Sequence, residues 1–410
     1  MQQDVKKWLF ALSVLGGIQQ LAFAQVLPAP TGDYHVGRLR IHWTDSQRPE
    51  ILGNSRDARR EINVDIWYPA KRGVLGPSAE YLSDLNAIKA GVPEQEFTDE
   101  FDAAAGAVRA GTIKTHSMLS VPIAPTPRRF PVVVFSHGLG VPPEGYTTQA
   151  EDLASHGYVV VAIEHTYDAF VSAFPDGRII DYEASNWDTK RGDEHAAYTK
   201  ARVDVWSSDI LFVIGKLHSI EATKSDFMLS GHLNLGCLAV VGHSMGGLAA
   251  IEACQKDHRI RACVDEDSLI YGTPFAWPDG RLTQPYMVLL TSTNFFPSRT
   301  DAQLARGGVD RATFNANVLR SQNELKTSLK SHGGIPTLAV FRDAAIEHMN
   351  FSDFKILQAS DHAQTVRSLT AIEDVRKVVL SFLDSCLLGK PGEFRRLNTS
   401  VGPVRVIPLV

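Results

Sequence analysis

Between Phe130 and Phe341 the chain repeats a short unbroken run of apolar residues followed by a turn and a segment of helical character. The apolar runs are Phe130–Phe135, Tyr158–Ile163, Leu238–Val241, Ala262–Val264, Tyr286–Leu290 and Thr337–Phe341. A strand that is apolar at every position has both of its faces covered, which is typical of parallel strands between two layers of helices. The pattern therefore predicts an α/β fold with a doubly wound, mostly parallel sheet.

The clearest helix lies between the second and third of these runs. Its apolar residues recur at steps of three and four, which places them on one face: Val203, Trp206, Ile210, Val213 and Leu217. Further helices are expected at Ala150–Ser155, Gly246–Cys254 and Ile372–Leu388.

The N-terminal part has a different pattern. Val36–Trp43 and Glu61–Tyr68 alternate apolar and polar residues, which is typical of half-buried antiparallel strands. We expect these two strands to form an antiparallel edge of the sheet. The segment Pro69–Arg129 is irregular and rich in small residues, and we expect it to cover the outside of the domain.

The first 24 residues have the features of a secretory signal peptide. Lys6 and Lys7 precede the apolar run Trp8–Ile18, and a small-residue sequence for cleavage ends at Ala24. At 1.5 Å per residue this run is too short for the ~30 Å hydrocarbon core of a bilayer. We expect export to the periplasm or the medium, with residues 25–410 forming a single α/β domain.

The charge balance argues against nucleic acid as a partner. The chain has 41 Lys and Arg residues against 46 Asp and Glu residues, a formal net charge of −5, and no basic stripe. The oligomeric state is left open by these features.

The cysteines are Cys237, Cys254, Cys263 and Cys386. Four are too few for a disulfide scaffold in a chain of 410 residues, and their spacing does not resemble a zinc site. We expect buried free thiols, with one disulfide as the alternative in an oxidising compartment.

A nucleophile motif follows the run that ends at Val241. In Gly242-His243-Ser244-Met245-Gly246, a serine stands between two glycines, at the junction of an expected strand and an expected helix. A Cβ at either glycine would collide with the neighbouring strand or helix, so the pattern predicts a sharp turn that presents Ser244 as a nucleophile. The alternative is a serine that caps a helix in a glycine-rich turn.

A nucleophilic serine requires a histidine base and an acid that orients it, which follow the serine in this order along such folds. The strand Ala262–Val264 leads into Asp265, Glu266 and Asp267. Alternation along a strand disfavours Glu266 and does not separate the other two acids.

The histidine should follow the last apolar run. His348 stands on the loop after Phe341, whereas its rivals are His332, before that strand, and His362, further along the chain.

Two backbone amides are expected to stabilise a developing oxyanion. One belongs to Met245, the residue after the nucleophile. The other is predicted at Leu139, in the glycine-rich turn Ser136–Gly140 that follows the first apolar run. No set of His, Cys or acidic residues has the spacing of a metal site, so neither a metal nor another cofactor is expected.

Several of these segments resemble the plasma-type (secreted) platelet-activating factor acetylhydrolase family of α/β-hydrolases. They are Val134–Gly140, Asp152–Gly157, Glu164–His165, Gly242–Gly247, Asp257–Arg261 and His348–Phe354. Counted through these segments, the resemblance implies that Asp267 is the acid, His348 the histidine, and Leu139 and Met245 the oxyanion donors.

The resemblance implies a cofactor-independent serine esterase that removes short or oxidised sn-2 acyl groups from phospholipids. Related enzymes include broad carboxylesterases, polyester hydrolases and dienelactone hydrolase-like enzymes. A peptidase or a catalytically inactive binding protein would be a further alternative.

The chain departs from the family after the acid, at Ser268–Tyr271, and at an unusual insertion, Phe295–Gly334. A second cap-like insertion, His165–Arg191, contains an expected hairpin that could form one wall of the site. Phe295 and Phe296 could contact a lipid surface, although such aromatic pairs more often pack under a loop.

Overall fold

The computed structural model describes residues 27–53, 57–83, 86, 111, 113–126, 128–182, 192–223, 226–268, 280–306, 308–399 and 401–409. The expected signal peptide lies outside the described residues, as do residues 183–191 of one expected insertion and 269–279 after the acids. Within the described ranges, no helix has both the length and the apolar character that a membrane span requires.

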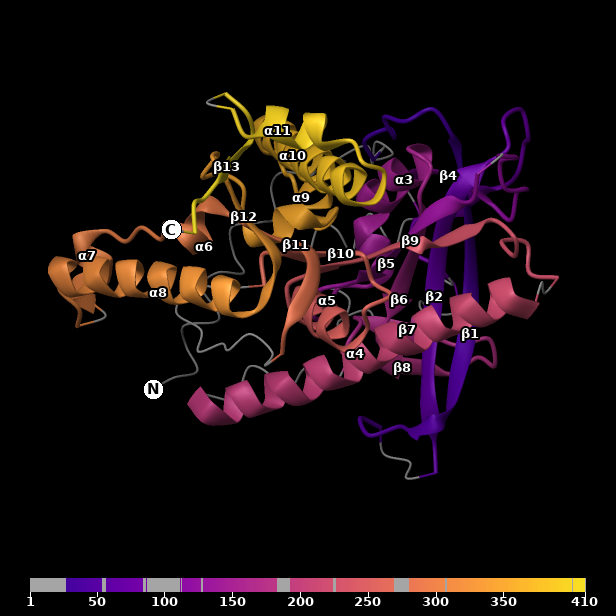
Figure 1. Cartoon of the computed structure of the whole chain (residues 1–410), viewed down its shortest axis with the longest axis horizontal. Helices are drawn as coiled ribbons and strands as arrows, with labels where there is room; N and C mark the ends of the chain where they lie inside the picture. Colours follow the sequence, from indigo (N-terminus) through magenta and orange to yellow (C-terminus); the bar gives the residue numbers. More distant parts are fainter. Residues whose placement is uncertain are drawn as a thin grey trace, which may run out of the picture.

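The described residues form an eleven-stranded sheet through the centre of the molecule (Figure 1). In spatial order its strands are β13 (Val404–Val406), β12 (Gly333–Phe341), β11 (Leu282–Leu290), β10 (Ala262–Glu266), β9 (Leu233–His243), β5 (Phe130–Ser136), β6 (Val159–Glu164), β2 (Arg59–Ala70), β1 (His35–Pro49), β4 (Lys114–Leu119) and β3 (Ser78–Glu80). From β12 to β6 all neighbouring strands are parallel. All six apolar runs therefore lie in the parallel part of the sheet, as predicted.

Helices cover both faces of this sheet (Figure 1). They are η1 (Pro143–Tyr146), α3 (Thr147–Ser155), α4 (Gly192–Thr223), α5 (Met245–Lys256), α6 (Ser292–Phe295), α7 (Asp301–Arg306), α8 (Arg311–Ser331), η3 (His348–Phe351), α9 (Phe354–Leu357), α10 (His362–Leu387) and α11 (Pro391–Leu397). Val132 and Val134 of β5 join the apolar core beneath α4 and α5. Val133 and Phe135 join the core beneath α3 and α10. Successive side chains of β5 thus fill opposite cores, which explains why the whole strand is apolar.

The five apolar residues that predict the longest helix are all buried in α4, as their spacing requires. The last long helix, α10, is longer than predicted, since it begins at His362 rather than Ile372. Its N-cap is Asp361, whose side chain accepts a hydrogen bond from the Gln364 amide. Because the first turns of α10 are largely polar and exposed, they carry little apolar periodicity.

β1 and β2 form the predicted antiparallel part at one side of the sheet, although they are not its outermost strands. β4 pairs with β1, and β3 extends the sheet further. Both outer strands come from the segment Pro69–Arg129, which was expected only to cover the outside. The buried side chain of β4 is Ser117, which donates to Glu151 of α3, so this strand lacks the apolar pattern that identifies the others.

The expectation of free thiols is wrong for two cysteines. Cys254, near the end of α5, forms a disulfide with Cys263 of β10. Their apolar surroundings, which favoured the expectation of buried thiols, are equally compatible with a buried disulfide. Cys237 and Cys386 are free and half-buried.

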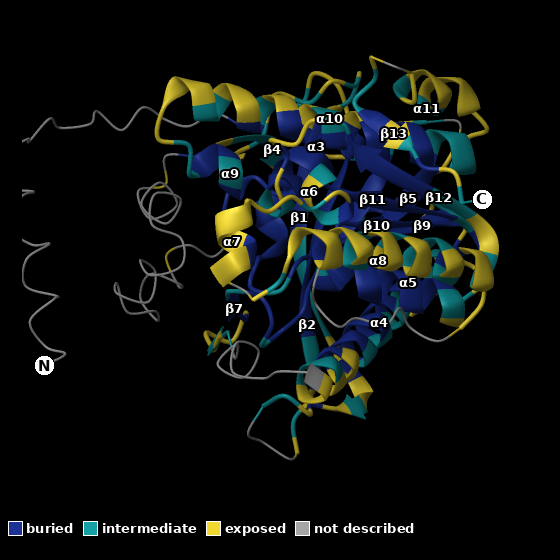
Figure 2. Cartoon of the chain, turned by 90° about the vertical axis from the view of Figure 1, so that its left-hand side faces the viewer, coloured by how far each residue is buried: buried dark blue, intermediate teal, exposed yellow. Residues whose placement is uncertain are grey.

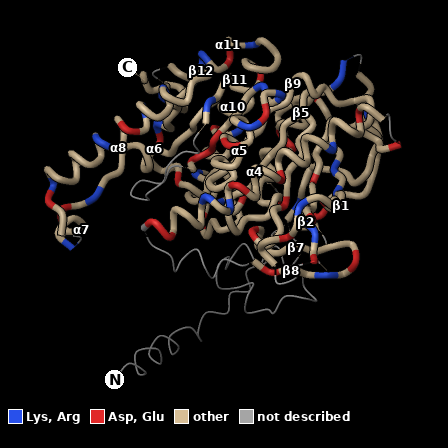
Figure 3. The backbone as a smooth tube through the Cα atoms, turned by 60° about the horizontal axis from the view of Figure 1, so that its bottom comes forward, with Lys and Arg blue, Asp and Glu red and all other residues tan. Residues whose placement is uncertain are grey.

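Both expected insertions have structure in their described parts. β7 (Val171–Ala173) and β8 (Ile179–Asp181) form the predicted hairpin. The helices α6, α7 and α8 lie between β11 and β12, and α7 and α8 are largely exposed (Figure 2). Lys and Arg positions are interspersed with Asp and Glu positions along the described chain (Figure 3).

Candidate active site

Ser244 lies in the sharp turn between β9 and α5, beyond the carboxyl end of a central parallel strand. Its backbone has φ 55° and ψ −122°, a conformation that residues with a side chain rarely adopt. A Cβ on Gly242 would lie 2.1 Å from the carbonyl oxygen of Gly246, and a Cβ on Gly246 would lie 2.2 Å from that of Ser136. The two glycines therefore make this turn possible, for the steric reason that the sequence pattern predicts.

His348 and Asp267 form a hydrogen-bonded chain with Ser244. His348 Nε2 lies 3.1 Å from Ser244 Oγ, and His348 Nδ1 lies 2.9 Å from Asp267 Oδ2. An ionised carboxylate only accepts hydrogen bonds, so Nδ1 carries the proton and Nε2 can accept from the serine hydroxyl. The His348 side chain is 28% exposed and that of Asp267 is fully buried. This geometry can move a proton from Ser244 to an imidazole that solvent and substrate can reach.

The other two acids at the end of β10 bond elsewhere. Asp265 accepts hydrogen bonds from the amide and the hydroxyl of Ser268, and Glu266 accepts from Gln149 of α3. Burial raises the pKa of Asp265 to about 7 and that of Glu266 to about 8. Of the three consecutive acids, Asp267 is thus the one that bonds to the histidine, which is the choice that the family resemblance implied.

Two residues after β11 hold the Asp267 carboxylate, and neither was identified from the sequence. The amide and hydroxyl of Thr291 donate to Oδ1 at 2.7 and 3.1 Å, and the Asn294 side-chain amide donates to Oδ2 at 2.8 Å. Thr291 is also the N-cap of α6, where its side-chain hydroxyl accepts a hydrogen bond from the backbone amide of Asn294. A threonine in capping position directly after a parallel strand is the sequence signal that could have revealed it.

The rival histidines lie elsewhere in the fold. His332 caps the end of α8 just before β12 begins. It therefore lies at the amino ends of the parallel strands, whereas Ser244 lies at their carboxyl ends. His362 is the exposed first residue of α10. His348 begins the short helix η3, which is capped reciprocally by Glu347 and Asn350. This capping fixes the backbone at the position from which the His348 side chain extends.

The glycine-rich loop after β5 lies beside Ser244. A Cβ on Gly138 would lie 3.4 Å from the Ser244 Cβ. The Gly138 amide donates to the Tyr146 hydroxyl, and the Gly140 amide donates to the carbonyl of Asp168. Both glycine amides of the loop are therefore already used in holding it.

The amides of Leu139 and Met245, the predicted oxyanion donors, differ in this respect. Neither donates a hydrogen bond to any residue that the structure describes. Met245 is the first residue of α5, where the helix dipole also favours negative charge. An oxygen bound next to Ser244 could accept hydrogen bonds from amides of this kind.

A second chain of Ser, His and Asp lies deeper in the molecule. Ser136 Oγ is 2.9 Å from His165 Nε2, and His165 Nδ1 is 2.9 Å from Asp209 Oδ2. All three residues are fully buried, and Arg60 donates to the same carboxylate. Burial lowers the pKa of His165, which keeps its ring neutral. Ser136 is closed to a substrate by its burial, and the chain of hydrogen bonds links the carboxyl ends of β5 and β6 to Asp209 of α4.

The hairpin β7–β8 reaches the same loop. A Cβ on Gly140 would lie 3.5 Å from the ring of Tyr182, which follows β8 directly. The hairpin therefore ends against the loop that contains Leu139, close to the position predicted for a wall of the site.

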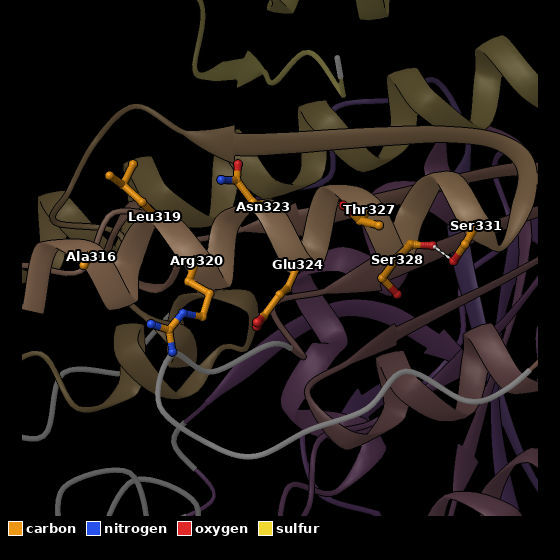
Figure 4. A pocket seen from close by; sticks show the side chains of 8 residues that line it. All are labelled: Ala316, Leu319, Arg320, Asn323, Glu324, Thr327, Ser328 and Ser331. Atoms are coloured by element: carbon orange, nitrogen blue, oxygen red, sulfur yellow. Dashed lines mark hydrogen bonds between the residues drawn. The ribbon is translucent and has the colours of Figure 1, made fainter. Parts of the chain in front are cut away.

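Two further features bear on ligand binding away from Ser244: a hollow along α8 and the arrangement of possible metal ligands. An open hollow of about 830 Å³ runs along α8, and those of its lining residues that the structure describes come from this helix (Figure 4). They include Leu319, Arg320 and Glu324, and none of these described lining residues belongs to the group around Ser244. Across the described ranges, no group of three or more His, Cys, Asp or Glu side chains could hold a metal ion.

The sheet order, the covering helices and the turn at Ser244 define an α/β-hydrolase fold. A ferulic acid esterase from Streptomyces cinnamoneus shares this fold, with a TM-score of 0.68 and 24% sequence identity, and the match covers 94% of this chain and 100% of that one. The sequence profile of the family described as platelet-activating factor acetylhydrolase, isoform II, matches residues 23–368. The chain belongs to this family.

Individual relatives match over shorter segments. The platelet-activating factor acetylhydrolase of Cavia porcellus is 26% identical over 215 residues, which cover 47% of this chain and 46% of the relative. The probable 1-alkyl-2-acetylglycerophosphocholine esterase of Arthroderma benhamiae is 28% identical over 146 residues, or 35% of this chain and 32% of the relative. The chain thus matches less than half the length of these relatives.

Proposed function

We propose that this protein is a serine esterase that hydrolyses carboxylic esters, with short or oxidised sn-2 acyl groups of phospholipids as its substrate class. The observation that carries the proposal is the hydrogen-bonded chain from Ser244 through the accessible His348 to the buried Asp267. Membership of the platelet-activating factor acetylhydrolase family supports the substrate class.

In the proposed acylation step, Ser244 Oγ attacks the ester carbonyl while His348 Nε2 takes its proton. The negative charge that develops on the carbonyl oxygen is stabilised by the amides of Leu139 and Met245. Asp267 keeps the proton on Nδ1 and stabilises the imidazolium. Collapse of the tetrahedral intermediate breaks the ester bond, and His348 gives the proton to the leaving alcohol.

In the deacylation step, water takes the place of the alcohol. His348 removes a proton from water, the resulting hydroxide attacks the acyl-enzyme, and the proton returns to Ser244 as the acid leaves. Every proton in this scheme is moved by a side chain of the protein, so the scheme contains no metal or cofactor.

Export is proposed from the N-terminal sequence, with cleavage after Ala24. Contact with a lipid surface is proposed for the insertion between β11 and β12, where Phe296 is 42% exposed and the neighbouring Phe295 is buried. N-terminal sequencing of the exported protein tests the cleavage site, and a vesicle-binding assay that compares Phe296→Ser with the wild type tests the lipid contact.

A substrate panel tests the proposed activity. It would contain p-nitrophenyl esters of increasing acyl length, phosphatidylcholines with an acetyl or a long sn-2 chain, a polyester film and a peptide p-nitroanilide. We expect hydrolysis of the short esters and of the acetyl phospholipid. Hydrolysis of short esters without the phospholipid would indicate a broad carboxylesterase or a dienelactone hydrolase-like enzyme. Turnover of the peptide alone, or of no substrate, would contradict the proposal.

A further inference from the structure

His243, the residue before the nucleophile, belongs to a buried hydrogen-bonded path that the catalytic scheme does not use. Its Nε2 lies 3.0 Å from the carbonyl oxygen of His348, and its Nδ1 lies 2.8 Å from the hydroxyl of Tyr146. That hydroxyl also accepts from the Gly138 amide at 2.8 Å. The path therefore joins the backbone of the glycine-rich loop Ser136–Gly140, called the oxyanion loop below, to the backbone of His348.

The chemistry of these groups allows one direction for each hydrogen bond. A carbonyl oxygen only accepts, so His243 Nε2 carries a proton and donates to His348. Burial lowers the pKa of His243 well below its usual value, so the ring is neutral and its Nδ1 is an acceptor. Tyr146 must then donate to Nδ1, which leaves its oxygen free to accept from Gly138. Burial raises the pKa of Tyr146, which keeps the hydroxyl protonated.

The packing around this path leaves little freedom. A Cβ on Gly138 would lie 2.9 Å from His243 Nδ1 and 3.1 Å from the Tyr146 hydroxyl. The Tyr146 ring packs against Phe135, with ring centroids 4.7 Å apart, and the His243 ring stacks on Phe351. Glycine at position 138 is what lets the phenol and the imidazole approach the loop.

We propose that Tyr146 and His243 are positioning residues that fix the oxyanion loop relative to His348. Neither touches the reacting atoms. Through Gly138 they orient the adjacent Leu139 amide, and through the His348 carbonyl they hold the residue that acts as base. This inference rests on the proposed function, because it assigns the purpose of the path to the alignment of the oxyanion donor with the base.

The decisive variant is Tyr146→Phe, which removes one oxygen and keeps the ring. Its matched control is Tyr158→Phe, because Tyr158 is also fully buried and its hydroxyl donates to Asp384, a residue outside the site. We expect Tyr146→Phe to lower kcat by about tenfold, the equivalent of one lost hydrogen bond, with KM changed less than about twofold. Tyr158→Phe should retain its kcat. Equal kcat values in the two variants would overturn the proposal.

Two further variants test whether Tyr146 and His243 act as one unit. His243→Phe, which keeps a ring but no hydrogen bonds, should resemble Tyr146→Phe, and the double variant should be no slower than the slower single variant, because the two residues act as one unit. If the double variant lost kcat by the product of the two single-variant losses, the two residues would not act as one unit.

Hydrogen–deuterium exchange provides a readout that is independent of activity. Peptides covering Gly138 and Leu139 should exchange faster in Tyr146→Phe than in Tyr158→Phe or the wild type. If Ser244→Ala retained full activity, the proposed function would fail. The exchange measurement would still decide whether Tyr146 restrains the loop, and unchanged exchange would overturn that restraint.

Discussion

Asp267 and His348 are 81 residues apart in the sequence, yet their side chains meet at 2.9 Å between Oδ2 and Nδ1. The two residues follow different strands of the same parallel sheet. Because the carboxyl ends of parallel strands share one edge, a short loop after each strand is enough to bring them together.

Ser244→Ala should retain the fold and lose activity by at least about 10³-fold, because the members of such a triad act as a unit. Ser136→Ala is the matched control, since this serine also bonds to a histidine but is sealed in the core. It should keep its kcat within about tenfold of the wild type. Initial rates on a short p-nitrophenyl ester measure both. More than a few per cent of wild-type activity in Ser244→Ala would refute the assignment of the nucleophile.

Asp267→Asn should lower kcat by orders of magnitude, since loss of the orienting acid favours the wrong tautomer of His348, an effect of about 10⁴ in one studied triad. Asp265→Asn should lose far less, because its carboxylate bonds to Ser268 instead. Circular dichroism of both variants checks that each is folded. An inactive Asp265→Asn beside an active Asp267→Asn would reverse the assignment.

The buried acids predict that the Tm falls between pH 6.5 and 8.5. In this range Glu266, with its pKa raised to about 8, holds a proton in the folded state that the unfolded chain has already released. Stability is therefore lost as the pH rises toward that value, by up to about 1.4 kcal/mol per pH unit for one group. The pKa values of the buried His243 and His165 are lowered. These two residues therefore reduce the stability of the protein only at lower pH, where the unfolded chain takes up protons that the folded chain does not.

Glu266→Gln should flatten this fall in Tm, whereas Glu373→Gln, at a half-exposed position on α10, should not. Thermal scans at intervals of half a pH unit measure the slopes. Equal slopes for Glu266→Gln and the wild type would show that the acid is not held protonated.

Reduction should destabilise the protein through the disulfide of Cys254 and Cys263, which are nine residues apart. Closing a loop of this size contributes about 2–3 kcal/mol by the loop-entropy estimate. Dithiothreitol should therefore lower the Tm of the wild type and of Cys237→Ser by several degrees. The Tm of the double variant Cys254→Ser/Cys263→Ser should not respond, and a wild type that is insensitive to the reductant would contradict the disulfide.

Activity should survive exhaustive chelation, because Ser244 supplies the nucleophile and no metal-bound hydroxide is required. The test is dialysis against EDTA followed by the ester assay, with a known metallohydrolase as the positive control. A loss of activity that zinc or calcium restores would contradict the proposed mechanism.

The turn at Ser244 was predictable because its requirement is local: two glycines and a strand followed by a helix. The residue pattern alone did not identify the partner of His348, because strand alternation treats Asp265 and Asp267 alike and the deciding contact is made across the sheet. Only the family resemblance favoured Asp267, which is the acid that bonds to His348. β4 was missed because its buried side chain, Ser117, is polar and pairs with Glu151. The disulfide depends on how closely α5 and β10 approach, which the spacing of the cysteines does not reveal.

The hold of Thr291 and Asn294 on Asp267 has a consequence for protein engineering. Both residues stand between the end of β11 and Phe295, so the segment that leads into the insertion Phe295–Gly334 supports the acid. A chimaera that exchanged the insertion for that of a relative should therefore place its junction after Asn294. A junction placed earlier would alter the alignment of the base together with the surroundings of the substrate, and the two effects could not be told apart in an assay.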